Sequence, residues 1–274
     1  MIEHNQIYNE DCLEFMKKLP DNYFDLIITD PPYGIDIASN GKVGGDNLGK
    51  AKDYGICEWD KSIPSKECFD EMKRVSKHQI IFGGNYMTEH LKPSSCWIVW
   101  DKDNTGNFAD CELAWTSFPK AVRKFKYRWN GMLQERMNFK EKRFHPTQKP
   151  VALGRWILDN FATKGDLIFD PFAGSGSFLL ASKQKGFDFV GCEINKDYVA
   201  VCKNRLAQQS VADFTSPNGD FSKEKEFNKD LEVSATPTPK EFQKEIPSLN
   251  PNIMPNFKIA LHNLEQLELK SGAT

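Results

Sequence analysis

The sequence predicts an α/β fold, with an open sheet of mostly parallel strands and helices on both of its faces. Two short, almost wholly apolar runs at residues 25–29 and 166–170 indicate strands that are buried on both sides. Prolines or glycines follow each run and end strand pairing, and a helical pattern comes next at 178–183. A third apolar run at 187–194 completes a strand–helix–strand alternation. This alternation is typical of Rossmann-like proteins.

The same patterns predict the remaining elements in chain order. We expect helices over residues 11–20, 65–77, 86–91, 151–161 and 195–206, and strands over residues 7–9, 79–84, 95–101 and 111–118. Asp11, Ser65 and Asn195 are suitable N-caps for three of these helices, and Pro150 suits the first turn of another. The last two strands are predicted to form an antiparallel pair at the edge of the sheet.

The first strand delivers a tetrapeptide, Asp30-Pro31-Pro32-Tyr33, to its carboxyl end. In open α/β sheets ligands bind at the carboxyl ends of the strands, so an acid and an aromatic ring here are candidate site residues. A plain turn that closes the strand would also explain the two prolines. A second stretch decides between these two interpretations.

That stretch is the loop Asp170-Pro171-Phe172-Ala173-Gly174-Ser175-Gly176, which follows the second strand. Glycines let a ligand approach the backbone closely, and the helix that follows offers free N–H groups. Glu193, at the tip of the third strand, comes 19 positions after Gly174, about the spacing at which an acid reaches ribose hydroxyls. Leu179 stands where a dinucleotide fingerprint needs its third glycine. A ligand with a ribose but no pyrophosphate is therefore expected.

Together with His145-Pro146-Thr147-Gln148-Lys149-Pro150, these motifs resemble the amino-methylating DNA methyltransferases over roughly residues 5–208. The tetrapeptide precedes the glycine loop, which resembles the circularly permuted motif order of the β group. The resemblance implies a Rossmann-like S-adenosylmethionine-dependent methyltransferase fold with a mixed seven-stranded sheet. It also implies a bacterial or phage-encoded enzyme that methylates a short motif in double-stranded DNA by base flipping.

By this resemblance the catalytic residues are Asp30, Pro31, Pro32 and Tyr33. An Asp in the first position favours N6 of adenine, whereas cytosine-N4 enzymes more often carry Ser there. Enzymes that methylate protein glutamine carry Asn, and an inactive DNA-binding module is a further alternative. The resemblance also implies S-adenosyl-L-methionine as the cofactor. The residues expected to bind it are Asp11, Cys12, Thr147, Gln148, Lys149, Asp170, Pro171, Phe172, Gly174, Ser175, Gly176, Glu193 and Ile194.

A basic segment at residues 120–149 is the strongest local charge feature. It holds ten Lys or Arg and two Glu, a net charge of +8 in a chain whose formal net charge is −2. Cations interleaved with aromatic rings are typical of phosphate binding, although a charge run is ordinarily a solvated face. The candidate DNA-binding residues are Arg123, Lys124, Lys126, Arg128, Arg136 and Arg143.

Composition limits the other classes of function. The seven cysteines and five histidines are scattered and lack a Cys-x-x-Cys spacing, so we expect reduced thiols and no metal site. No apolar segment follows Met1 and no long apolar run exists, so neither a signal peptide nor a membrane span is predicted, and a cytoplasmic location is expected.

The expected domain organisation is a catalytic domain at residues 1–209 and a polar, flexible tail at residues 210–274. Within the catalytic domain we expect a mobile glycine-rich loop at 34–60 and a basic DNA-recognition insert at 120–145. The small insert favours a short target or recognition by a homodimer. A cognate restriction endonuclease is a further expected partner.

Overall fold

A computed structural model of the chain describes residues 2–35, 62–103, 109–130, 133–145 and 147–207, and the backbone of two short strands, β3 (Lys42–Val43) and β4 (Lys52–Asp53). The predicted mobile loop lies outside the described residues except for residues 34–35 and these two strands. The predicted tail lies outside them entirely.

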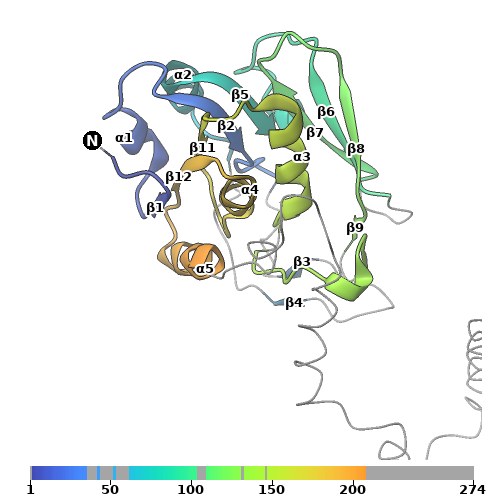
Figure 1. The fold of residues 1–274 in the computed structure, drawn as a ribbon. Helices are drawn as coiled ribbons and strands as arrows, with labels where there is room; N and C mark the ends of the chain where they lie inside the picture. The colour runs from blue at the N-terminus through green and yellow to red at the C-terminus, as the bar shows by residue number, and fades with distance from the viewer. Residues whose placement is uncertain are drawn as a thin grey trace, which may run out of the picture. The chain divides into compact units, whose positions relative to one another are not determined.

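One mixed eight-stranded sheet forms the centre of the fold, in the order β1-β12-β11-β2-β5-β7-β6-β8 (Figure 1). Its strands are β1 (Gln6–Tyr8), β2 (Phe24–Thr29), β5 (Ser76–Phe82), β6 (Trp97–Asp101), β7 (Cys111–Thr116), β8 (Arg123–Lys126), β11 (Leu167–Asp170) and β12 (Asp188–Cys192). Within this sheet β7 is antiparallel to both of its neighbours, and the other pairings are parallel. The fold is therefore the α/β, Rossmann-like class that the sequence predicts.

The eighth strand is the difference from the predicted seven. β6 and β7 form an antiparallel pair, as expected. They do not form the edge of the sheet, because β8, which comes from the basic segment, pairs in parallel with β6. Charged residues dominate β8, which is how natural sheets protect an edge strand from pairing with other chains.

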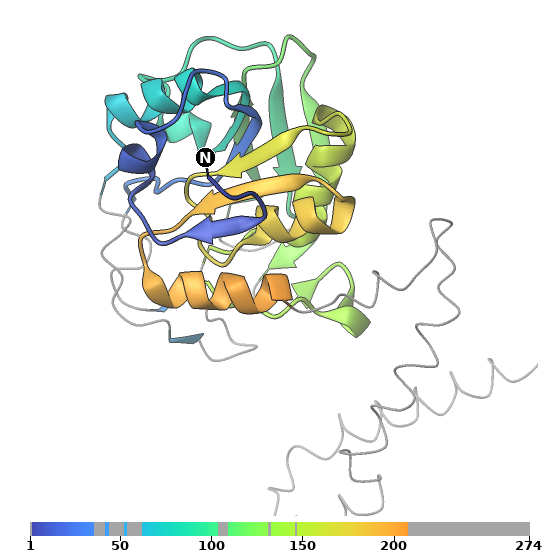
Figure 2. The same ribbon diagram turned by 60° about the vertical axis from the view of Figure 1, so that its left-hand side comes forward.

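Helices cover the two faces of the sheet separately. On one face lie α3 (Val151–Phe161), α4 (Ser177–Lys185) and α5 (Lys196–Ala207), and on the other lie α1 (Cys12–Met16) and α2 (Lys66–Val75). Figure 2 shows α5 in orange beside the end of the sheet that holds β1. Short elements complete the described chain: β9 (Trp129–Asn130), β10 (Leu133–Gln134) and the 3₁₀ turns η1 (Gly84–Tyr86) and η2 (Met137–Phe139).

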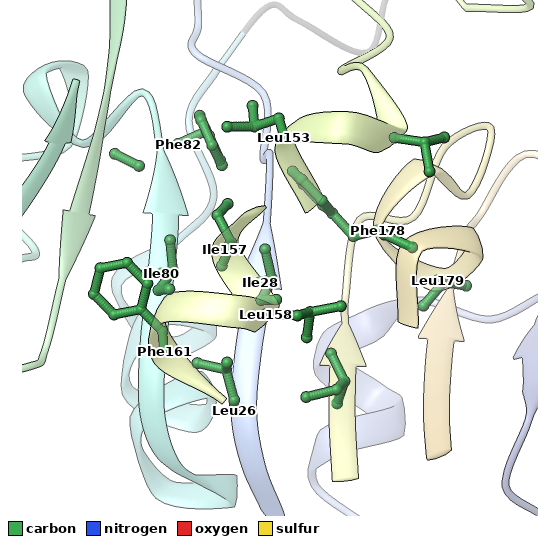
Figure 3. Close-up of a cluster of buried hydrophobic side chains, with 14 of the residues drawn as sticks. Leu26, Ile28, Ile80, Phe82, Leu153, Ile157, Leu158, Phe161, Phe178 and Leu179 are labelled. Carbon is green, nitrogen blue, oxygen red and sulfur yellow. The ribbon is translucent and has the colours of Figure 1, made fainter. Parts of the chain in front are cut away.

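The alternation of side chains along the central strands builds both cores. Leu26 and Ile28 of β2 point into the cluster under α3 and α4, where Figure 3 shows them with Phe178, while Ile27 points into the cluster under α1 and α2. All four side chains are at most 3% exposed. Burial of such side chains is worth roughly 1.5–3 kcal/mol each, which fixes the register of the central strands.

The predicted helix at residues 86–91 is wrong. The chain there forms only the three-residue turn η1, because Gly83 takes a left-handed φ of +67° and its ideal Cβ would lie 2.2 Å from the ring of Tyr33. The close approach of that ring requires glycine and forces the chain to turn directly after β5.

The glycine loop before α4 gives a direct test of packing. Gly176 has a φ of +77°, and its ideal Cβ would lie 2.2 Å from the Sγ atom of buried Cys202. Gly186 has a similar φ of +73° and no atom within 4 Å of its ideal Cβ. Gly186→Ala should lower the free energy of unfolding by about 1–2 kcal/mol through backbone strain alone. Gly176→Ala should cost a further ~1–3 kcal/mol through overpacking.

Urea denaturation of both variants measures the difference. Cys202→Ala in the Gly176→Ala background should recover the packing part and leave the strain. Equal losses for the two glycine variants would contradict this account of the loop.

Candidate active site

Three acids lie at the same edge of the sheet because the strands that deliver them are parallel neighbours. Asp170 ends β11, Asp30 directly follows β2, and Glu193 directly follows β12. The chain leaves β11 and β2 toward opposite sides of the sheet, so the edge between them is the topological switch point where α/β proteins bind ligands. The structure thus brings together the two motifs that are 140 residues apart in the sequence.

The Asp30 carboxylate has a partner on each oxygen. The Tyr33 hydroxyl donates to Oδ1 at 2.6 Å, and the Lys149 ammonium donates to Oδ2 at 2.6 Å. Burial raises the pKa of Asp30 above its ordinary value, and the charge of Lys149 opposes that rise. The site therefore holds a desolvated carboxylate in a fixed orientation.

Glu112 is a site residue that the sequence reasoning missed. It lies near the start of β7, and because β7 runs antiparallel to β5, its first residues lie at the edge where the parallel strands end. Its Oε2 lies 3.0 Å from the Lys149 ammonium, and its Oε1 forms an ion pair with Lys102. The available signal was a lone acid at the start of a strand predicted to be reversed.

Tyr33 has an aromatic partner at this edge. Its ring stacks on Tyr86 of η1, with centroids 5.1 Å apart and planes at 17°. Tyr86 is 46% exposed and Tyr33 is half-buried, so the ring of Tyr86 is the exposed member of the pair. Offset stacking of this kind contributes ~0.5–1.5 kcal/mol beyond area burial and holds the Tyr33 ring in place.

Asp170 is buried at 1% exposure and anchors the start of the glycine loop. Its Oδ1 accepts hydrogen bonds from the Thr29 hydroxyl at 2.8 Å and from the Phe172 N–H at 3.1 Å. Burial raises the pKa of the Asp170 carboxyl to about 8, and the two hydrogen bonds oppose the rise. Pro171 is buried, and the partly buried ring of Phe172 packs against the core under α1 and α2. This packing anchors the loop to the core.

Backbone groups hold Glu193. The Gly174 N–H donates to Oε2 at 2.8 Å and the Asn195 N–H donates to Oε1 at 2.8 Å. Burial raises the pKa of Glu193. The apolar side chain of the neighbouring Ile194 is 70% exposed. Asp11 is also exposed, and its carboxylate caps α1 by accepting hydrogen bonds from the Leu13 and Glu14 N–H groups. Cys12 instead points into the core, with its Sγ 3.9 Å from that of Cys68.

The His-Pro-Thr-Gln-Lys-Pro segment makes several contacts within the protein. Lys149 lies on Asp30, as described above. Gln148 is buried, accepts from Ser175 Oγ at 3.1 Å and from the Phe144 N–H at 2.8 Å, and thereby fastens this segment to the glycine loop. The Thr147 hydroxyl lies 3.1 Å from His145 Nδ1.

A buried ion pair extends that connection. Arg205 of α5 donates to the Ser175 carbonyl at 2.6 Å and to Glu141 Oε1 at 2.8 Å. Glu141 Oε2 accepts the first N–H of α3, from Val151, at 3.0 Å. This acid of the basic segment therefore caps a helix and neutralises a buried cation, and it does not offset the surface charges.

The candidate DNA-binding residues divide by their contacts. Three of them form ion pairs with acids near the end of β6: Lys124 with Asp101 at 2.8 Å, and Lys126 at 2.8 Å and Arg128 with Asp103. Arg143 lies over the Trp129 ring at 5.6 Å. Arg123 and Arg136 are exposed and make no ion pair within the part of the chain that the structure describes.

The residues of this edge suit a ligand with ribose, amino-acid and purine parts. Glu193 offers a carboxylate to hydroxyls beside the exposed apolar surface of Ile194. Across residues 2–35, 62–103, 109–130, 133–145 and 147–207, no group of three His, Cys, Asp or Glu could hold a metal ion. In the same ranges, none of the helices has the length and apolar character needed to cross a bilayer.

Comparison with known proteins agrees with this geometry. The N6/N4 methyltransferase family model, described as DNA methylase, matches residues 112–204, which hold the Glu112 and Lys149 positions and the glycine loop. The type II methyltransferase M2.MboI of Moraxella bovis is 24% identical over 73% of this chain and 86% of its own length. The type II methyltransferase M.HinfI of Haemophilus influenzae is 27% identical over 74% of this chain and 68% of its own length. Over these residues the chain is similar to the N6/N4 DNA methylase family.

These similarities support an S-adenosylmethionine-dependent DNA methyltransferase. A similar solved structure is the M1.HpyAVI complex with S-adenosylmethionine, 23% identical over 74% of this chain and 99% of that one, with a TM-score of 0.48. Another is the cytosine-N4-specific PvuII DNA methyltransferase, 16% identical over 82% of this chain and 92% of that one, with a TM-score of 0.46.

The environment of Asp170 predicts a pH dependence of stability. Because its pKa in the folded protein, about 8, lies above the ordinary value of 3.8, the folded state holds a proton that the unfolded state releases between these values. The free energy of unfolding should therefore fall as the pH rises from 4 to 8. Asp170→Asn should flatten this fall by about 1 kcal/mol or more, since a tenfold difference in proton affinity between the two states corresponds to ~1.4 kcal/mol.

Urea denaturation at pH 5.5 and pH 8 measures this effect, with Asp159→Asn on the exposed end of α3 as the control. The control should keep the wild-type pH dependence. If Asp170→Asn kept it as well, Asp170 would not be protonated in the folded protein.

Proposed function

We propose that this methyltransferase transfers a methyl group from S-adenosylmethionine to N6 of adenine in a short motif of duplex DNA. The observation that carries the proposal is the buried carboxylate of Asp30, held by Tyr33 and Lys149 one strand away from the Asp170 loop. An Asp in this position of the tetrapeptide is the choice of adenine-N6 enzymes, to which the motif is similar. Cytosine-N4 methylation is the alternative within the family.

The chemistry explains why the carboxylate is needed. The lone pair of an aromatic amine is delocalised into the ring, which makes the nitrogen a poor nucleophile. Asp30 and the Pro31 carbonyl would accept hydrogen bonds from the two amine protons and favour a tetrahedral nitrogen whose lone pair points away from the ring. Pro31 and Pro32 fix the direction of that carbonyl. Positioning of this kind contributes a large part of the rate in bimolecular transfers.

The target base must leave the duplex to reach a carboxylate that is 16% exposed. Extrusion of a base costs a few kcal/mol, which stacking on an aromatic side chain offsets in part. The exposed ring of Tyr86, which stacks on Tyr33 beside Asp30, supports this role.

The cofactor supplies an electrophilic methyl group when it is bound. The backbone of Asp170, Pro171, Phe172, Gly174, Ser175 and Gly176 would hold its amino-acid part, Glu193 would accept its ribose hydroxyls, and Asp11 and Ile194 would contact its adenine. The hydrogen bonds from Gly174 and Asn195 orient Glu193 for that purpose and oppose the rise that burial causes in its pKa. The contacts of Gln148, Thr147 and Cys12 favour an indirect role, in shaping the walls of the site.

We propose residues 1–209 as the catalytic domain of a cytoplasmic enzyme. Its relatives M2.MboI and M.HinfI are type II methyltransferases, which supports a cognate restriction endonuclease as a partner. The small size of the basic segment supports recognition of a short target, or recognition by a homodimer.

Transfer of labelled methyl to mixed genomic DNA, followed by nucleoside mass spectrometry and modification-aware sequencing, tests the proposal. We expect N6-methyladenine in one short motif. Asp30→Ala should lower kcat by about 10³-fold, because a donor or acceptor aimed at the reacting group is worth that much, and leave the Kd of the cofactor within a few fold. Glu193→Ala should mainly raise that Kd.

Other products would change the conclusion in defined ways. N4-methylcytosine would replace the proposed base and keep the family. An unmethylated DNA pool with cofactor still bound would point to protein or RNA substrates, or to an inactive module. Near-normal turnover by Asp30→Ala would refute the role of the tetrapeptide.

The basic segment predicts a salt-dependent affinity for DNA. Each phosphate contact contributes about −0.9 to the slope of log K against log salt concentration. Arg123→Ala should weaken binding uniformly across sequences and reduce the slope by about one. Reversal of charge at Arg123, Lys124 and Arg128 together should flatten it further. Filter-binding titrations at several salt concentrations measure both effects.

Lys66→Ala serves as the control, because Lys66 is an exposed cation of α2 paired with Asp70. It should leave the slope unchanged. A wild-type slope in the triple variant would remove these residues from the DNA interface.

A further inference from the structure

Lys149 is a buried cation that lies between two carboxylates. Its side chain is 5% exposed, and its ammonium lies 2.6 Å from Asp30 Oδ2 and 3.0 Å from Glu112 Oε2. The three residues come from the segment before α3, the end of β2 and the start of β7. Burial of an ammonium costs several kcal/mol unless opposite charges surround it, so this arrangement is built around the cation.

The surroundings of the ammonium shield it from water. It lies over the rings of Tyr33 and Phe82, at 5.5 Å from each centroid, and 3.4 Å from the Tyr33 hydroxyl. That hydroxyl donates in turn to Asp30 Oδ1. Lys149, Tyr33 and Asp30 thus form a closed ring of contacts in which each member fixes the direction of the next.

The charges of the cluster depend on this one cation. Lys149 and Lys102 balance Asp30 and Glu112, and Lys102 reaches only Glu112 among the ion pairs of the described residues. Without the charge of Lys149, Asp30 and Glu112 would face each other in a desolvated site. Two carboxylates in that position cannot both stay ionised, and one of them would take a proton.

The protonation state of Asp30 matters for the proposed reaction. An ionised carboxylate accepts hydrogen bonds through both oxygens, with about four lone-pair sites, so Asp30 can accept from the target amine while Tyr33 and Lys149 keep their bonds. A protonated Asp30 becomes a donor toward an amine that must itself donate. The site would then lose the acceptor on which the tetrapeptide chemistry depends.

We propose that Lys149, anchored by Glu112, is a positioning residue that keeps Asp30 ionised and aimed at the target amine. This inference rests on the proposed function and deepens it, because it moves Lys149 from the cofactor to the catalytic carboxylate. It also gives Glu112 a role at the site. The two residues act on Asp30 in opposite directions, since Lys149 lowers the pKa of Asp30 and Glu112 raises it.

Because Lys149 and Glu112 act on the pKa of Asp30 in opposite directions, their variants should shift the pH profile in opposite directions. Loss of a purely structural contact would not produce such opposite shifts. Lys149→Met removes the charge and keeps the length of the side chain. It should lower kcat by about 10²-fold or more, leave the KM of the cofactor within a few fold, and move the acid limb of the kcat–pH profile to higher pH by about one unit or more. Glu112→Gln should move the same limb to lower pH.

Two variants serve as controls. Lys149→Arg keeps the charge, so its acid limb should stay within about half a pH unit of wild type even if kcat falls. Lys185→Met changes a lysine of α4 that pairs with Asp159 away from the site, and it should match wild type in kcat and in the profile. Thermal denaturation and cofactor binding confirm that each variant is folded.

A readout without catalysis separates this inference from the proposed function. The ¹³Cγ resonance of Asp30, assigned by its loss in Asp30→Asn, reports the titration of that carboxyl directly. Its midpoint should rise in Lys149→Met and fall in Glu112→Gln. The other titratable groups that face the cluster are Tyr33, Asp170, Lys102, Tyr86 and His145, and both variants retain them.

The outcomes are distinct. Absence of methyl transfer by wild type would overturn the proposed function, and the titration would still test Lys149. If Lys149→Met raised only the cofactor KM with an unmoved acid limb, Lys149 would belong to the cofactor site and the inference would be wrong. If Lys149→Met did not fold, the titration of Glu112→Gln would decide, and an unmoved or raised midpoint would overturn the inference.

Discussion

The hydrogen bond from the Thr29 hydroxyl to Asp170 Oδ1 joins the two central strands at the point where the topology reverses. Thr29 is the last residue of β2, and Asp170 is the last residue of β11. The tetrapeptide begins at the residue after Thr29 and the glycine loop begins at Asp170 itself, so this one contact sets the distance between the two motifs. Because both groups are buried, breaking the bond would leave an unpaired polar atom in the core, at a cost of ~1–3 kcal/mol. The two halves of the site are therefore held in one frame.

Desolvation imposes a second constraint on the same edge. Each buried acid there has a partner from another element: Asp30 has Lys149, Glu112 has Lys102, and Glu141 has Arg205. These pairs cross between segments that look independent in the sequence. Removal of one partner of a buried pair costs about 3–5 kcal/mol, so the basic segment cannot shift at Glu141 without disturbing Arg205 and, through it, the glycine loop. The segment proposed to contact DNA and the loop proposed to hold the cofactor thus share a rigid connection.

The parts of this structure that local pattern determines were predictable. Apolar runs identified the central strands, Asp11 and Asn195 cap α1 and α5 as predicted, and the carboxyl-edge rule brought Asp30 together with Asp170. The parts that depend on neighbours in space were not. The direction of β7 places Glu112 at the site, and the contact of Lys149 with Asp30 depends on long-range packing that no local pattern encodes. The strand β8 also escaped prediction, because its charged residues resemble a solvated loop.

The charge of the basic segment shows why a count along the sequence overstates an electrostatic surface. Of the cations that give residues 120–149 their net charge of +8, Lys149 is buried on Asp30, while Lys124 and Lys126 form exposed ion pairs with Asp101 and Asp103. Exposed pairs of this kind contribute ~0–1 kcal/mol, so a phosphate can replace the carboxylate at little cost. In the free protein the pairs hold β8 against the end of β6, and they leave the same cations available to an incoming strand of DNA. A buried cation such as Lys149, whose partners are Asp30 and Glu112, cannot be exchanged in this way.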